Sequence, residues 1–309
     1  MQFLAAYVLK GRMQAVLVTA VMAILALLLP PFSYLSGASV ALVTLRLGLQ
    51  AGLQLSLFAT AAVALLLMMF RQPPQLSGVF LLVLWLPVWA LAMNLRRTAA
   101  PAQSIVLALL FGVMVLLGFY LAIDNPTEWW SQFLHQAMAP MLEQVPEAEL
   151  PQWEADIAVM APLMSGLVAA GMMASLLGCL LLGRWWQAQL FNPGGFGEEF
   201  RRLRLGQTLA AAALLLAVAL LLQQAGEGGG SVLLDLLALA QVVFALQGAA
   251  VAHALVRLGG GHRGWLIAMY LLLLLFMGQV VLLLAIVGVL DNWFDLRSRF
   301  GRGKQTEIK

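Results

Sequence analysis

The otherwise apolar segment 232–256 carries four side chains that can do chemistry: Asp235, Gln241, Gln247 and His253. Ionisable groups inside membrane segments are rare and costly, which makes them functional candidates. On one helix Asp235 and His253 lie five turns, or about 27 Å, apart, so the two side chains cannot touch. They can both line one polar path through the membrane. We predict that Asp235, Gln241 and Gln247 face a ligand. The alternative for the two glutamines is hydrogen bonding between helices.

Arg46 is a further candidate, in the apolar stretch VALVTLRLGLQAG. A charge at the centre of a membrane helix costs roughly 2.5–3.5 kcal/mol. Two interpretations remain open. The long side chain can extend from the end of its segment to the membrane surface, or it can meet a buried partner or a ligand.

Motifs for other chemistry are absent from the sequence. The three histidines are scattered, and neither a zinc-binding HExxH spacing nor a GxSxG nucleophile turn occurs. The glycines of 193–197 precede Glu198 and Glu199 rather than the Lys and Ser or Thr of a phosphate-binding loop. We therefore expect no enzyme activity, no cofactor and no metal site.

The composition indicates a chain whose solvent is lipid. The 309 residues are 62% hydrophobic and 10% charged, with a mean hydropathy of +0.93, whereas a soluble domain has about 25% charged residues. The net charge of +3 is spread over many connectors, which argues against a nucleic-acid surface. The expected class is an all-α, polytopic transmembrane helix bundle in contact with the bilayer.

About nine apolar blocks approach the length of about 20 residues that a membrane span needs, which predicts eight to nine spans. The second and third nearly meet at Gly48, where we expect a tight turn or a kink. The blocks are 13–29, 34–49, 50–70, 76–93, 102–123, 157–183, 207–223, 232–256 and 265–290.

Charges between the blocks predict an orientation. Lys10 and Arg12 place the N-terminus in the cytoplasm, and later crossings keep most basic connectors there, as the positive-inside rule requires. A ninth crossing would put the basic tail, 297–309, outside. We therefore favour eight full crossings with both ends inside, with one late block re-entrant or kinked.

The connector 124–156 falls outside in this scheme and holds seven acidic residues but no Lys or Arg. Asn125, followed by Pro and then by Glu128, resembles a helix start. Apolar side chains then recur at helical spacing. This predicts an amphipathic helix on the membrane surface, with Trp129 and Trp130 at headgroup level. It either covers the bundle or acts as a lid over a cavity.

The stretch RWWQAQLFNPGGFGEEFRRLRLG, residues 184–206, concentrates charge in a chain that has little. We predict a turn at 192–195, a short helix from about Gly197, and Trp185 and Trp186 at the membrane interface. The stretch is a cytoplasmic elbow. It can also dock a protein partner, for which the candidates are its basic residues Arg201, Arg202 and Arg204.

Small side chains four residues apart mark several blocks, including Ala15, Thr19 and Ala23 in the first. In lipid the close approach of backbones drives helix pairing. The usual interpretation is packing inside the bundle, and the alternative is docking of a membrane partner on the first block.

The elbow, together with the tail GVLDNWFDLRSRFG at 287–301, resembles the YybS-like family of predicted bacterial membrane proteins, which has no established activity. The resemblance runs over nearly the whole chain. It implies a bacterial inner-membrane protein.

The first six blocks are similar in outline to the S components of energy-coupling-factor vitamin transporters, on the pattern Pro30-Pro31 … Leu45-Arg46-Leu47-Gly48 … Gly52. The resemblance implies capture of a vitamin or metal from the outer side. It also implies ligand-side positions at Tyr34, Trp129 and Trp130 and a partner surface at Ala15, Thr19 and Ala23. Thr19 replaces the usual alanine, and the blocks after 206 depart from the six-helix plan.

These patterns divide the chain into a six-span bundle at 1–183, the elbow at 184–206 and C-terminal spans with a basic tail at 207–309. We expect a transporter-like protein that handles a small solute from the outer side. The alternative is a membrane scaffold that recruits cytoplasmic partners through the elbow and the tail.

Overall fold

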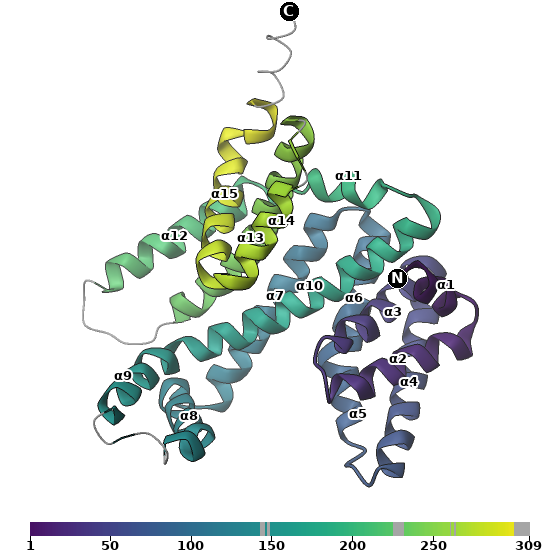
Figure 1. The fold of residues 1–309 in the computed structure, drawn as a ribbon, viewed down its shortest axis with the longest axis horizontal. Coiled ribbons are helices and arrows are strands. Elements are labelled where there is room, and N and C mark those ends of the chain that lie inside the picture. Colours follow the sequence, from purple (N-terminus) through teal and green to yellow (C-terminus); the bar gives the residue numbers. More distant parts are fainter. Residues whose placement is uncertain (143–145, 147–148, 225–231, 260, 263, 300–309) are drawn as a thin grey trace, which may run out of the picture. The chain divides into compact units, whose positions relative to one another are not determined.

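The computed structural model describes residues 1–142, 146, 149–224, 232–259, 261–262 and 264–299. The regular elements in this part of the chain are all helical (Figure 1). Six helical stretches are long and apolar enough to cross a membrane, and four shorter apolar helices accompany them. The predicted all-α, multi-span class is therefore confirmed. The basic tail from residue 300 lies outside the described residues, as do Glu143, Glu147 and the glycines of 225–230.

The chain forms two compact units that do not follow chain order. Unit 1 contains residues 1–108 and 174–204, and unit 2 contains 109–173 and the chain from 205 onward. The fifth and the sixth apolar blocks each contribute to both units, and the division predicted at 183 and 206 stays a prediction. Each unit is described by itself below.

Unit 1 is built on the N-terminal helices and the second half of α10. Their apolar side chains form one core, with Trp85 and Trp186 fully buried in it. The helices are α1 (Gln2–Leu9), α2 (Arg12–Ala26), α3 (Phe32–Leu47), α4 (Leu49–Met69), α5 (Leu76–Val79), α6 (Leu86–Thr98) and α11 (Gly195–Arg201), with a π-helical stretch Phe80–Trp85 before α6.

A two-step hydrogen-bond relay joins three elements of unit 1. The indole Nε1 of Trp85 donates to Ser36 Oγ at 3.0 Å, and Ser36 Oγ donates to the backbone oxygen of Thr19 at 2.9 Å. The relay satisfies polar groups that lipid cannot satisfy. It explains why a Trp and a Ser are tolerated at the centre of an apolar core.

The turn predicted between the second and third blocks is present at Gly48. Its φ of +105° is a backbone conformation that favours glycine, so α3 ends at Leu47 and α4 starts at Leu49. Arg96 supports the turn, because its Nη1 donates to the backbone oxygens of Leu45 at 2.5 Å and Thr44 at 3.4 Å.

Unit 2 contains the connector helices and the C-terminal helices. The blocks predicted at 102–123, 207–223 and 232–256 agree closely with helices, whereas those predicted at 157–183 and 265–290 do not. The helices are α7 (Pro101–Ala122), α8 (Pro126–Leu142), α9 (Leu150–Met160), α10 (Met164–Phe191), α12 (Gln207–Gln224), α13 (Val232–Gly259), α14 (Gly264–Leu275) and α15 (Met277–Phe294), with α7 and α10 shared with unit 1.

The predicted ninth block, 265–290, is wrong as a single span. The helix breaks at Phe276, where φ is −131° and ψ is 54°, and the twelve-residue α14 is about 18 Å long, shorter than a hydrocarbon core of about 30 Å. On α15 Gly288 lies against Phe244 of α13, and Asp291 lies against Gln247.

The order of these contacts shows that α13 and α15 run in the same direction (Figure 1). α14 therefore carries the chain back between them. The C-terminal end of α15 also meets the start of α12, because Gly206 N donates to Asn292 Oδ1 at 3.1 Å.

The contact between α13 and α15 is close enough to bring backbones together. A Cβ at Gly248 would overlap the backbone oxygen of Leu284, and one at Gly288 would overlap that of Phe244. Gly248 belongs to the small-residue pattern that marks helix packing in lipid. The glycines are therefore required by the approach of the two helices.

We expect Gly248→Val to destabilise the protein by about 1–3 kcal/mol, because the added methyl groups must push α15 away. Gly278→Val is the matched control, since a Cβ there meets no atom within 4 Å. Thermal unfolding of the purified protein in detergent checks the difference. Equal melting temperatures for the two variants would contradict the packing described here.

Candidate functional site

Asp235 is a buried carboxylate within a membrane-type helix. It lies in the first turn of α13, and 1% of its surface is exposed. Its Oδ2 accepts a hydrogen bond from Tyr120 Oη of α7 at 2.7 Å, and its Oδ1 accepts one from Gly166 N of α10 at 2.9 Å. Three helices of unit 2 thus meet on one side chain.

Gly166 permits this meeting. A Cβ at this position would lie 2.6 Å from Oδ1 and 2.8 Å from Cα of Asp235. Any larger residue would therefore push α13 away from α10. The role of this glycine is to admit the carboxylate to a backbone amide.

The charge of this carboxylate has no cationic counterpart in the described chain. Both oxygens meet neutral donors, and no Lys, Arg or His among the described residues forms an ion pair with Asp235. Burying an isolated charge is far more costly than burying a hydrogen-bonded neutral group. The site is therefore suited to take up a proton or a cation.

The predicted amphipathic helix of the connector is present as α8. Its start is the predicted capping arrangement: Glu128 N donates to Asn125 Oδ1 at 3.2 Å, and Asn125 Nδ2 donates to Glu128 Oε2 at 3.3 Å. These bonds satisfy donors at the helix start and fix where α8 begins.

Trp130 holds α8 against the other helices of unit 2. Its side chain is 7% exposed, its Nε1 donates to Ser165 Oγ at 2.9 Å, and its ring centroid lies 5.7 Å from that of Phe119. Trp129 next to it is 40% exposed and stacks on Phe133. The two tryptophans therefore have different roles, one an anchor and the other a surface residue.

Consecutive residues connect α8 to the carboxylate. Trp130 contacts Phe119 and Ser165, and Asp235 binds the next residue of each helix, Tyr120 and Gly166. Two predicted candidates, Trp130 and Asp235, thus share one site through α7 and α10. We use the name Asp235 cluster for the following residues: Asp235, Tyr120, Gly166, Trp130, Phe119 and Ser165.

Gln247 lies at a second polar site of unit 2. It is fully buried; its Oε1 accepts from Leu205 N at 3.0 Å, and its Nε2 donates to Asp291 Oδ2 at 3.4 Å. Asp291 in turn is paired with Arg297, whose Nη2 lies 3.0 Å away. This is the hydrogen-bonding role considered for the glutamine; a ligand-facing role stays a prediction.

Gln241 and His253 lie elsewhere on α13. Gln241 is partly buried beside an apolar cavity of about 220 Å³ between α12, α13 and α15. The His253 ring packs edge-on against Tyr270 of α14, with centroids 5.8 Å apart. Neither residue belongs to the Asp235 cluster.

Tyr34 and Arg46 belong to unit 1, whereas Trp129 and Trp130 belong to unit 2. Tyr34 is partly exposed at the start of α3, and its hydroxyl is 3.4 Å from Ser175 Oγ. Arg46 is exposed in the last turn of α3, with its guanidinium carbon 4.0 Å from the ring centroid of Phe191. This is the arrangement expected of a side chain that extends from a helix end.

The predicted docking stripe on the first block faces inward. Ala15, Thr19 and Ala23 are 4%, 0% and 0% exposed in the core of unit 1. They therefore pack within the chain, which is the usual interpretation of such a stripe. In this structure they present no surface to a partner.

The elbow has the predicted turn and short helix. Gly195 N donates to the backbone oxygen of Asn192 at 3.0 Å, Gly194 has a φ of +90°, and α11 follows. An ion pair between Arg184 and Glu199 ties α11 to α10. Among the docking candidates, Arg201 is partly buried, whereas Arg202 and Arg204 are exposed.

The position of Trp186 at the membrane interface stays a prediction, and the structure places its side chain in a protein core. α10 continues as a regular helix to Phe191, so Trp186 remains on the helix and turns into the core of unit 1, where it is 0% exposed. Trp185 is partly buried against the same core.

Three features of unit 2 were not predicted from the sequence: Tyr120, Asp291 and the hydrogen bond that Gly166 donates to the carboxylate. Tyr120 sits near the end of a uniform apolar block, and nothing in its own segment marks it. Asp291 carried a signal, because it is an acid at the end of the last apolar block, in the stretch that supports the family resemblance.

The chain belongs to the family of predicted membrane proteins described as DUF2232, which matches residues 17–292. No curated protein and no solved structure matches the chain. The family description gives no activity. The YybS-like name and the similarity to S components therefore stay predictions.

We expect Tyr120→Phe to destabilise unit 2 by about 1–3 kcal/mol, because it leaves one oxygen of a buried carboxylate without its donor. Tyr34→Phe is the control, since that hydroxyl makes only a 3.4 Å contact at an exposed position. Unfolding in detergent measures both. In a double-mutant cycle with Asp235→Asn, additive effects would show that the two groups are not coupled.

Proposed function

We propose that this family member is a transporter-like protein of the bacterial inner membrane, which binds a small solute at the end of unit 2 covered by α8. Asp235 is the group that receives positive charge from the solute or from a coupling proton. The observation that carries the proposal is a buried carboxylate that, among the described residues, is held by a tyrosine hydroxyl and a backbone amide.

The energetics of burial support this role. Moving a carboxylate out of water costs several kcal/mol, which is recovered only by a cation or by many hydrogen bonds. Asp235 has two neutral donors and no paired cation in the described chain. In a transport cycle, a cation or a proton binds to the carboxylate and later leaves it. This role explains the presence of a buried carboxylate, which a purely structural site would not require.

The position of α8 supports access from the side of the connector. Trp130 fixes the helix, and Trp129 keeps an exposed face beside it. The connector is acidic and lacks Lys and Arg, so the positive-inside rule places it outside and the N-terminus in the cytoplasm. We propose uptake from that side, as the resemblance to S components implies, and a binding protein rather than an enzyme.

We expect Asp235→Asn to abolish stabilisation by the solute, because the neutral amide cannot exchange positive charge. The measurement is the melting temperature of the purified full-length protein against a panel of vitamins, amines and metal ions. Asp124→Asn is the matched control, an exposed acid in the connector before α8. It should retain the full ligand-dependent shift.

Two outcomes would contradict the proposal. One is that no member of the panel raises the melting temperature of the wild type. The other is that Asp235→Asn responds as strongly as the wild type, which would place the binding site elsewhere.

A second candidate function is a scaffold that recruits a cytoplasmic partner through the elbow. The exposed Arg202 and Arg204, beside an α11 anchored by the Arg184–Glu199 pair, favour it. Replacing both arginines with Gln should remove specific crosslinks in cells, since the contacts would be electrostatic. Crosslinked partners that are unchanged by the double substitution would refute the scaffold role.

A further inference from the structure

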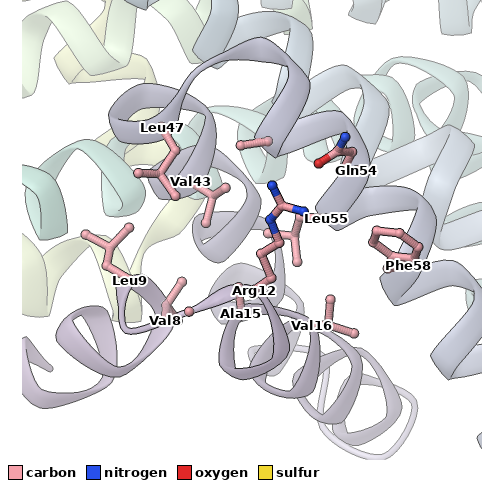
Figure 2. Close-up of a pocket in the computed structure, with 12 residues that line it drawn as sticks. Val8, Leu9, Arg12, Ala15, Val16, Val43, Leu47, Gln54, Leu55 and Phe58 are labelled. Atoms are coloured by element: carbon pink, nitrogen blue, oxygen red, sulfur yellow. The ribbon is translucent and has the colours of Figure 1, made fainter.

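A cavity of about 330 Å³ opens at one end of unit 1, between the α1–α2 junction, the end of α3 and the start of α4 (Figure 2). This volume is at the lower end of the range for small-molecule sites. Most of the wall is apolar, and its polar side chains are those of Arg12 and Gln54. Leu47 and Phe58 line it and are 59% and 57% exposed.

The exposed apolar residues show where the cavity opens. Because the chain belongs to a membrane-protein family and both residues are exposed and apolar, we infer that Leu47 and Phe58 face lipid tails rather than water. The cavity is therefore accessible to an acyl chain from the side. Its floor is formed by Val43 and Leu55.

Arg12 supplies the charge. Figure 2 shows its side chain between Val43 and Leu55, with Gln54 beyond. In the described part of the chain, its guanidinium has no hydrogen bond, ion pair or ring contact. Arg12 is also the first residue of α2, where the helix dipole adds positive potential.

Two other arginines of unit 1 are already engaged. Arg96 donates to backbone oxygens at the end of α3, and Arg46 lies over the Phe191 ring. Arg12 therefore differs from them, because its charge is directed into a lipid-accessible apolar cavity without a protein partner.

We propose that this cavity binds an acidic phospholipid of the bilayer. The phosphate of the headgroup meets Arg12, with Gln54 as a second polar contact, and an acyl chain lies along Leu47 and Phe58. Charge complementarity selects the anionic headgroup, and the apolar wall selects a lipid over a free anion. The site is separate from the Asp235 cluster and does not rest on the function proposed for it.

The test is lipid binding by the full-length protein, measured by native mass spectrometry from mixtures of phosphatidylglycerol and phosphatidylcholine. We expect Arg12→Gln to lower the preference for phosphatidylglycerol about fivefold, the effect of one basic side chain facing an anionic headgroup. Arg12→Lys should largely retain the preference.

Arg97→Gln is the matched control, because Arg97 is an exposed arginine near the end of α6, outside the cavity, and its removal changes the net charge equally. It should leave the preference within about twofold of wild type. An equal loss in both variants would show a diffuse charge effect and overturn the site. An unchanged preference in Arg12→Gln, or competition by inorganic phosphate alone, would also overturn it.

Discussion

Lipid offers no hydrogen bonds, and this constraint determines how the helices of this protein pair. Several hydroxyl side chains inside the helices satisfy it locally by donating to the backbone oxygen one turn earlier, as in Ser39, Thr44, Ser56 and Thr60. Such residues need nothing from a neighbouring helix. The side chains that cannot satisfy themselves in this way, above all Asp235 and Gln247, determine which helices must meet.

In unit 2 these side chains fix α13 at two levels. Near its start, Asp235 binds α7 and α10; twelve residues later, Gln247 binds α15 and the chain before α12. Gly248 then allows α15 to lie in backbone contact. Polar bonds thus specify which helices pair, and small residues determine how closely the paired helices approach. Together they give the bundle a defined arrangement, although the hydrophobic effect supplies little driving force between helices in lipid.

The features that could be predicted from the sequence are those that depend on neighbouring residues. Apolar blocks, the turn at Gly48 and the capped start of α8 at Asn125 all follow from local patterns. The partner of Asp235 could not be predicted, because Tyr120 is 115 residues away in the chain and its own block is uniformly apolar. The break at Phe276 likewise has no Pro to announce it, and the nearby Gly278 does not by itself distinguish a broken helix from a continuous one.

One peptide unit links the surface helix to the buried charge. Ser165 contributes the side chain that Trp130 binds, and the amide of the following peptide bond is the one that Asp235 accepts from. The Cα of Ser165 belongs to that planar peptide group, so the two hydrogen bonds are attached to one short backbone segment of α10 with only the χ1 torsion of Ser165 between them. α8 and α13 are therefore joined through neighbouring atoms of α10.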